Sequence, residues 1–191
     1  MNLATDGVQT MTQDAYGLTQ AWRQRPRQTA IGRILLNDTT GCLHPAFIEA
    51  AQNAQVLACL PNAAMRCSDI SVYETRVIPR VLARCLPGLV LHWHSDGYLG
   101  TAPVVRALWY LTDVDDERDG PFECILRSQS YGVIRRDWGW TLRDTVSDLP
   151  RQRVFTALGK AGTIVLFNPN IIHRATLPRR CSRVAAVFTY T

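Results

Sequence analysis

The chain has almost no lysine, and its positive charge is not concentrated in one region. Lysines and arginines number 21 against 16 acidic residues, and Lys160 is the only lysine. The arginines are scattered, with short clusters within residues 23–27, 135–136 and 179–183. Nucleic-acid binders usually gather basic residues in a stripe with interleaved aromatics, so we expect no nucleic-acid partner. The net charge of +5 fits an ordinary solvated surface; the functional alternative is a preference for anionic small molecules or an acidic partner.

Long apolar runs and paired cysteines are also missing from the sequence. No run of about 18 apolar residues occurs, so we expect no membrane span. The first 18 residues have neither a basic start nor an apolar core, and so do not resemble an export signal. The six cysteines form no C-x-x-C pair, and their spacing fits no zinc site. We therefore expect free thiols and a cytoplasmic location.

The length and composition predict one folded domain over residues 1–191. The hydrophobic fraction of 47% is that of an ordinary globular protein with a single core. Within this domain we expect an N-terminal arm or a short helix over 1–29, a strand-and-helix cover over 30–87 and a β-rich core over 88–191. One helix is predicted over residues 44–60, with Pro45 in its first turn and Pro61 after its end.

Short apolar runs separated by turn residues dominate the chain from residue 69 onward. Strands are expected at residues 31–36, 69–78, 89–94, 104–112, 122–127, 163–167 and 183–191. Strands of this length, broken by Gly, Pro, Asp and Asn, are typical of a sandwich or a barrel. The sequence therefore predicts a mainly β protein.

The stretch LVLHWHSD, residues 89–96, holds two of the four histidines of the chain. Side chains of a strand alternate between its two faces, so His92, His94 and Asp96 are expected on one face. Trp93 is expected on the other face, where it would pack in the core. A strand end that presents three potential metal ligands on one face indicates a metal site.

A second histidine region completes a spaced set of candidate residues. His173 follows the apolar run TIVLF and a Pro/Asn turn, and Arg183 lies ten residues further on, at the start of the last apolar run. The order His94-x-Asp96, a distant His173 and then Arg183 resembles the Fe(II)/2-oxoglutarate-dependent dioxygenases.

Within that superfamily, the chain most resembles the phytanoyl-CoA dioxygenase-like group. Residues 106–130 resemble its strand, acidic loop and G-P-[LF] turn, and residues 159–175 resemble its Gly-rich turn, apolar strand and metal histidine. The resemblance covers roughly residues 88–191. One departure is the sequence Arg-Ser-Gln-Ser at 127–130, where family members commonly have a P-G-S-H-like motif.

The resemblance implies a double-stranded β-helix, a jelly-roll or cupin-like barrel, with N-terminal helical cover and a metal-binding core. His94, Asp96 and His173 would hold Fe(II), because two imidazoles and one carboxylate leave three octahedral positions open. 2-Oxoglutarate would take two of these positions and O₂ the third. Arg183 would bind the far carboxylate of 2-oxoglutarate, because its planar fork matches a carboxylate. The implied activity is oxidation, most simply hydroxylation, of a small organic metabolite, with release of succinate and CO₂.

Two other interpretations of these residues stay open. His92, His94 and His173 could form a three-histidine cupin-type site, but Tyr98 stands where cupins usually have a glutamate. A jelly roll without catalysis could keep only a ligand pocket. The related halogenases have a small residue in place of the aspartate, so Asp96 favours hydroxylation over halogenation.

Three further residues are candidates for contacts near the metal or the substrate. His92 is expected to face inward beside the iron, either as a contact of cosubstrate, substrate or metal ligand or as a packed core residue. Tyr98 is a candidate for the rim of the pocket. Arg106 has two interpretations, a partner for an anionic group in the barrel or a surface residue. The expected partner is a small, anionic molecule, and a homo-oligomer stays open. A role in specialised metabolism is a hypothesis drawn from size and composition.

Overall fold

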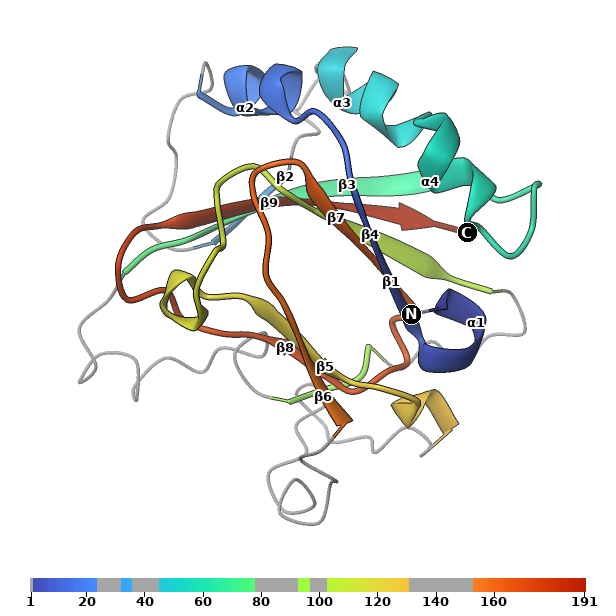
Figure 1. Ribbon diagram of the computed structural model, residues 1–191. Helices are drawn as coiled ribbons and strands as arrows, with labels where there is room; N and C mark the ends of the chain where they lie inside the picture. The colour runs from blue at the N-terminus through green and yellow to red at the C-terminus, as the bar shows by residue number, and fades with distance from the viewer. Residues whose placement is uncertain (1, 24–31, 36–44, 78–92, 97–102, 131–152) are drawn as a thin grey trace.

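Two antiparallel sheets face each other in the computed structural model of the chain (Figure 1). The structure describes residues 2–23, 32–35, 45–77, 93–96, 103–130 and 153–191. The larger sheet has the strand order β1-β7-β4-β9-β3-β2 and the smaller one has the order β6-β5-β8. This mainly β, jelly-roll arrangement is the predicted fold class.

The elements have the following bounds. The strands of the larger sheet, in chain order, are β1 Val8–Thr12, β2 Gly32–Leu35, β3 Cys67–Thr75, β4 Val105–Tyr110, β7 Thr163–Phe167 and β9 Arg183–Tyr190. The strands of the smaller sheet are β5 Phe122–Ile125, β6 Val154–Ala157 and β8 His173–Ala175. The helices are α1 Leu3–Asp6, α2 Tyr16–Arg23, α3 Pro45–Ala51 and α4 Ala54–Ala58, with short 3₁₀ turns at Glu117–Asp119 and Ser128–Ser130.

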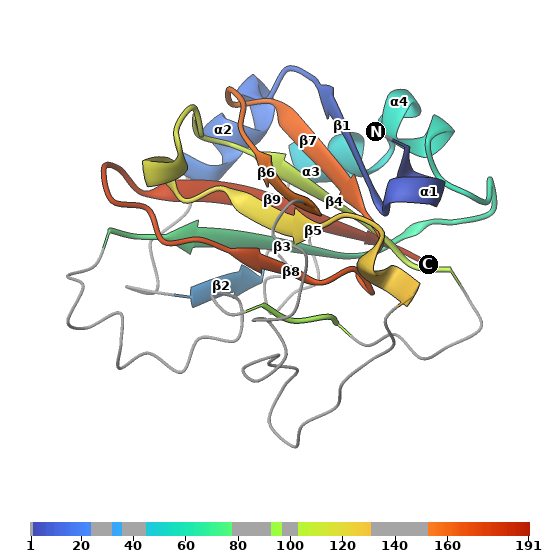
Figure 2. The same cartoon turned by 60° about the horizontal axis from the view of Figure 1, so that its bottom comes forward.

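The central strands β4, β7 and β9 of the larger sheet are buried on both faces, and β9 shows how the residues divide between them. Val184, Ala186 and Phe188 pack in the cluster that contains the buried residues of α2, α3 and α4. Ala185 and Val187 instead pack between the two sheets. The helices therefore cover the outer face of the larger sheet, as Figures 1 and 2 show. Because faces alternate along a strand, Arg183 lies on the inward face, between the sheets.

The helix predicted over residues 44–60 is in fact two helices, α3 and α4. Pro45 begins α3 as expected. The break comes at Asn53, whose side chain accepts hydrogen bonds from the backbone N–H groups of Gln55 and Val56. An asparagine that caps a helix in this way starts a new helix and ends the previous one. The apolar pattern predicted helix here correctly, but not the interruption.

The expectation of an arm or a short helix over 1–29 did not include a strand, which the described residues of this range contain beside the helices α1 and α2. Residues 8–12 form β1, which pairs with β7 in register from Val8 opposite Phe167 to Thr12 opposite Thr163. Val8 is fully buried between the sheets. The prediction was wrong for these residues because an edge strand buries few side chains, so Gln and Thr dominate its sequence.

Six of the expected strands are present, with ends shifted by up to three residues. In order, β2, β3, β4, β5, β7 and β9 correspond to the expected ranges 31–36, 69–78, 104–112, 122–127, 163–167 and 183–191. The strand expected over 89–94 lies largely outside the described residues. The sequence did not predict β6 or β8, which are short and flank β5. Short strands carry too few residues for a period-two pattern to be visible.

Gly162 is a position where only glycine fits, in the turn before β7. Its φ is +101°, and a Cβ there would lie 1.9 Å from the backbone oxygen of Gln13. We expect Gly162→Ala to lower the free energy of unfolding by about 2 kcal/mol or more, since strained backbone alone costs about 1–3 kcal/mol. Urea unfolding would measure the change.

Gly17 provides the matched control for this substitution. It lies in helix α2, and the nearest atom to its added Cβ would be 3.9 Å away, on Ala46. Gly17→Ala is expected to leave stability unchanged or raise it by up to about 0.5–1 kcal/mol, because alanine favours a helix more than glycine and Gly17 lies in the first turn of α2. Equal destabilisation by both alanines would contradict the steric argument for Gly162.

The described cysteines differ in burial, and their reactivity is expected to differ too. Burial raises the pKa of the Cys67 thiol to about 11 and that of Cys124 to about 12, whereas Cys181 is exposed. At pH 8 roughly one Cys67 thiol in a thousand is then a thiolate, the reactive form. We expect iodoacetamide at pH 8 to label Cys181 first and Cys67 and Cys124 slowly, as peptide mass spectrometry would show. Labelling of Cys67 should accelerate as the pH rises toward 11.

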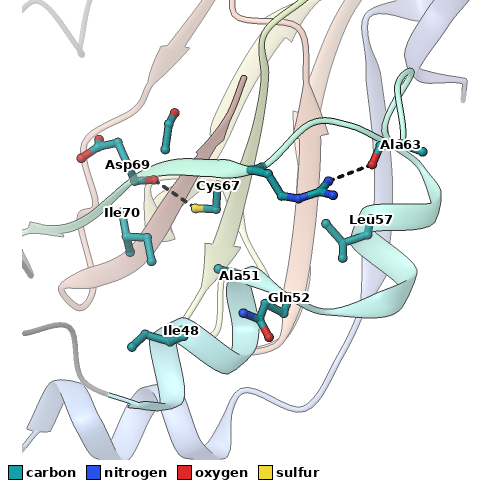
Figure 3. A pocket seen from close by; sticks show the side chains of 10 residues that line it. Ile48, Ala51, Gln52, Leu57, Ala63, Cys67, Asp69 and Ile70 are labelled. Atoms are coloured by element: carbon teal, nitrogen blue, oxygen red, sulfur yellow. Dashed lines mark hydrogen bonds between the residues drawn. The ribbon is translucent and has the colours of Figure 1, made fainter.

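A hollow of about 690 Å³ opens on the helical side of the molecule, between α3, α4 and the start of β3 (Figure 3). Its lining includes the partly exposed side chains of Ile48 and Leu57. Ile70, also in the lining, packs in the cluster on the outer face of the larger sheet. The hollow is therefore separated by that sheet from the space between the sheets.

No helix among the described residues has the length and apolar character to cross a membrane.

Candidate metal centre

The segment 93–96 lies beside β8, and the two candidate histidines face each other there. His94 N donates to His173 O over 2.9 Å, and His173 N donates to His94 O over 2.8 Å. This reciprocal pair is an antiparallel bridge, which adds residue 94 to the edge of the smaller sheet. Two residues of such a bridge project to the same face of the sheet. The two imidazole centroids are accordingly 4.4 Å apart.

Trp93 lies on the opposite face, as the alternation of the sequence predicted. It packs against the small cluster formed by Ile125 and Ile172. The guanidinium of Arg174 lies 4.4 Å from the centroid of its ring, and Arg174 also forms an ion pair with Glu123 at 2.6 Å. These contacts tie the segment to the outer face of the smaller sheet and direct His94 inward.

Asp96 lies in the same segment as His94, and its backbone is bonded to the turn between β7 and β8. Its backbone N–H donates to Pro169 O over 3.0 Å, and the Ser95 hydroxyl donates to Asn170 O over 3.1 Å. The Pro/Asn turn before His173 therefore fixes the backbone of Asp96. The sequence separates Asp96 from this turn by more than 70 residues, and the fold brings them together.

The side chains of His94, Asp96 and His173 form a group of potential metal ligands. Their ligand atoms all lie within 4.8 Å of one another. His94 Nε2 is 3.8 Å from Asp96 Oδ1, and His173 Nε2 is 3.7 Å from Asp96 Oδ2. Both histidines are buried and Asp96 is partly buried. Three donors from two chain segments converge on one point, as a metal site requires.

His173 is held as a neutral imidazole with one nitrogen turned toward the group. Burial, and then the neighbouring His94, lower the pKa of His173 from 6.5 to about 4, although Asp96 acts in the opposite direction. Its Nδ1 is 2.8 Å from Ile171 O, and a carbonyl can only accept, so Nδ1 carries the proton. The lone pair of a neutral ring is then on Nε2, the atom near Asp96. The rings of Phe122 and Phe167 pack against the imidazole.

Arg183 is buried at the start of β9 and faces the space between the sheets. Its guanidinium donates to Gly120 O through Nη1 and to the Thr75 hydroxyl through Nη2, the latter over 2.9 Å. Within the described part of the chain it forms no ion pair with a carboxylate, and its buried Nε has no hydrogen-bond partner. Burial lowers the pKa of this guanidinium, whereas Tyr110 acts to raise it.

Of the other three candidate residues, Arg106 lies in the described part of the chain and His92 and Tyr98 do not. Arg106 lies on the inward face of β4, and its Nη1 donates to Asp96 Oδ2 over 2.6 Å. Sequence reasoning did not identify Thr75 or Gly120 as neighbours of Arg183. The G-P turn was a signal for Gly120, but nothing in the sequence marks Thr75, which is opposite Arg183 only through the register of β3 and β9.

The fold is a jelly roll, and two histidines and one carboxylate form a group of potential metal ligands in it. The profile of the phytanoyl-CoA dioxygenase (PhyH) family matches residues 2–179. The chain therefore belongs to this family, whose enzymes use Fe(II), 2-oxoglutarate and O₂. The resemblance predicted from the sequence is confirmed. No curated protein sequence matches the chain.

Solved structures with the same fold have low sequence identity to this chain. The epimerase SnoN, in complex with Fe³⁺, α-ketoglutarate and nogalamycin RO, has a TM-score of 0.74 at 15% identity, over 100% of this chain and 80% of its own. HygX from Streptomyces hygroscopicus, with nickel, 2-oxoglutarate and hygromycin B bound, has a TM-score of 0.68 at 17% identity, over 98% and 84%. Apo EctD from S. alaskensis has a TM-score of 0.68 at 17% identity, over 99% and 74%.

Proposed function

We propose that this chain is an Fe(II)- and 2-oxoglutarate-dependent oxygenase that hydroxylates a small organic metabolite. The observation that carries the proposal is the convergence of His94, Asp96 and His173 within 4.8 Å in a chain of the phytanoyl-CoA dioxygenase family. Membership of the family supports an oxygenase of this class. The assignment of individual residues rests on the contacts of each side chain.

The donor set of His94, Asp96 and His173 fits Fe(II). Two neutral imidazoles and one carboxylate are the ligands that non-haem iron oxygenases present on one face of an octahedral ion. The Nδ1 proton of His173 is engaged by Ile171 O, which directs Nε2 to the metal. The turn at Pro169 holds the backbone of Asp96, so the carboxylate reaches the same point.

Arg183 would bind the far carboxylate of 2-oxoglutarate. A buried cation with no carboxylate partner in the described part of the chain is costly unless an anion joins it. The bonds to Gly120 O and Thr75 fix the plane of the guanidinium. Arginine suits this role because its N–H groups match the two oxygens of a carboxylate.

The iron and its cosubstrates would supply the oxidising power: the substrate C–H becomes C–OH while 2-oxoglutarate and O₂ become succinate and CO₂. The chain would hold the metal and the keto acid between the sheets, where the packed rings of Phe122 and Phe167 exclude water from His173. The basic composition supports a small, anionic substrate, and SnoN and HygX were crystallised with nogalamycin RO and hygromycin B. Four other statements stay predictions: that the protein binds no nucleic acid, that it is located in the cytoplasm, that it can form a homo-oligomer, and that it acts in specialised metabolism.

The test begins with anaerobic addition of Fe(II) and 2-oxoglutarate to the metal-free protein. Chelation of iron by a keto acid gives a weak visible charge-transfer band, which we expect in the wild type and not in Asp96→Ala. Iron binding without the band would favour the three-histidine interpretation, and no binding would leave only a ligand pocket.

Hydroxylation is tested separately, because SnoN is an epimerase of the same fold. With a substrate found by screening for succinate release, a hydroxylase incorporates one atom of ¹⁸O₂ into its product. A product with no added oxygen would contradict hydroxylation while leaving the oxygenase class intact.

A further inference from the structure

Arg106 makes a close contact with one of the candidate metal ligands. Its Nη1 donates to Asp96 Oδ2 over 2.6 Å, the length of a strong, charge-assisted hydrogen bond. The two side chains are only 23% and 18% exposed, so the pair is better shielded than an ordinary surface ion pair. The backbone of Arg106 is fixed on both sides, opposite Phe167 of β7 and Thr189 of β9.

This contact makes the two oxygens of the Asp96 carboxylate different. Oδ1 lies 3.8 Å from His94 Nε2 and Oδ2 lies 3.7 Å from His173 Nε2, so both oxygens are near the metal group, but of these two Arg106 contacts Oδ2. A carboxylate can bind a metal through one oxygen or through both. Binding through both would occupy a fourth position of an octahedral ion and leave two, too few for a chelating keto acid and O₂ together. A guanidinium on Oδ2 opposes this second bond because it takes up one of the lone pairs of that oxygen and draws its negative charge away from the metal.

We propose that Arg106 is a positioning residue that keeps Asp96 bound to the metal through Oδ1 alone, so that three positions stay open. The inference rests on the proposed function, because it assumes that Asp96 is a metal ligand. Arg106 then acts at the keto-acid end of 2-oxoglutarate, and Arg183 acts at the far carboxylate. The two arginines are distinguished by which part of the cosubstrate each one affects.

Removal of the guanidinium has opposite consequences for the metal and for the keto acid. In Arg106→Gln both carboxylate oxygens can reach the metal, and a positive charge near it is lost, so metal affinity is unchanged or higher. The keto acid loses a position to Asp96 and also loses a nearby cation. Its affinity is therefore expected to fall by at least about 10-fold, which corresponds to about 1.4 kcal/mol.

Calorimetry with Ni(II), which does not react with O₂ in such sites, measures these affinities without any turnover. Ni(II) is titrated into the metal-free protein, and then 2-oxoglutarate or pyruvate is titrated into the Ni(II) form. Pyruvate has the keto-acid end but no far carboxylate. We expect Arg106→Gln to weaken both keto acids by the same factor and to keep Ni(II) affinity. Arg118→Gln, which breaks an exposed pair with Asp116, is the matched control and should change nothing.

Arg106→Lys separates position from charge. Lysine keeps the positive charge but lacks the planar fork, so we expect it to leave most of the keto-acid defect in place. Full recovery in Arg106→Lys would overturn the inference in favour of charge alone. Wild-type affinity in Arg106→Gln, or a loss for 2-oxoglutarate but not pyruvate, would also overturn it. Failure of the wild type to bind Ni(II) or keto acid would overturn the proposed function, and this inference with it.

Discussion

Replacement of Asp96 by alanine is expected to lower affinity for Fe(II) or Co(II) by more than about 100-fold, because partners of metal ligands alone usually contribute 10–100-fold. The substitution removes the one anionic donor among the three side chains. It also leaves the Arg106 guanidinium, formerly 2.6 Å from Asp96, without that counter-charge beside an incoming cation. Two imidazoles remain, but they offer no charge to offset the dehydration of a divalent ion. Anaerobic metal titration would measure the loss.

The control for Asp96→Ala is another aspartate with a basic partner. Asp113 pairs with Lys160 at 3.2 Å, and both side chains are more than half exposed. Asp113→Ala should leave metal affinity unchanged, and circular dichroism should show that both variants are folded. His173→Ala is expected to match Asp96→Ala. If His92→Ala removed the metal while Asp96→Ala kept it, the three-histidine pairing would be correct instead.

Local alternation along a strand was enough to predict which way the side chains of residues 93–96 point. Trp93 packs outward under Arg174, and His94 and Asp96 converge with His173. A period of two needs only that the segment be extended, and it does not depend on which strand lies beside it. Arg183 was placed differently, by its position at the start of the last apolar run, and it does begin β9 with its side chain buried.

Contacts that depend on register could not be predicted in the same way. The sequence left Arg106 either inside the barrel or on the surface and did not identify Asp96 as its partner. Thr75 meets Arg183 only because β3 and β9 pair with these residues opposite each other. Register is set by the packing of whole faces and by turns, which no short motif encodes. For the same reason β1 was missed: its pairing with β7 gives Val8 a buried place that its polar neighbours do not suggest.

Replacement of Arg183 by glutamine is expected to weaken 2-oxoglutarate binding by at least about 100-fold. Each hydrogen bond to a charged group contributes about 1.5–3 kcal/mol, so two lost bonds remove about 3 kcal/mol or more. The site around Arg183 is buried, so solvent does not replace these bonds. Ni(II) affinity should be retained, because Arg183 is not among the three side chains that form the metal group.

Pyruvate decides whether Arg183→Gln removes an anchor or disturbs the barrel. Arg183 also ties Gly120 to Thr75, so its loss could in principle loosen the turn before β5 and lower every affinity. Pyruvate has no far carboxylate, so an intact site in Arg183→Gln binds it as the wild type does. The ratio of pyruvate to 2-oxoglutarate dissociation constants should therefore fall toward one in Arg183→Gln and stay near the wild-type value in Arg106→Gln. Equal weakening of both keto acids in Arg183→Gln would contradict the anchor, because only a general disturbance of the site would affect pyruvate.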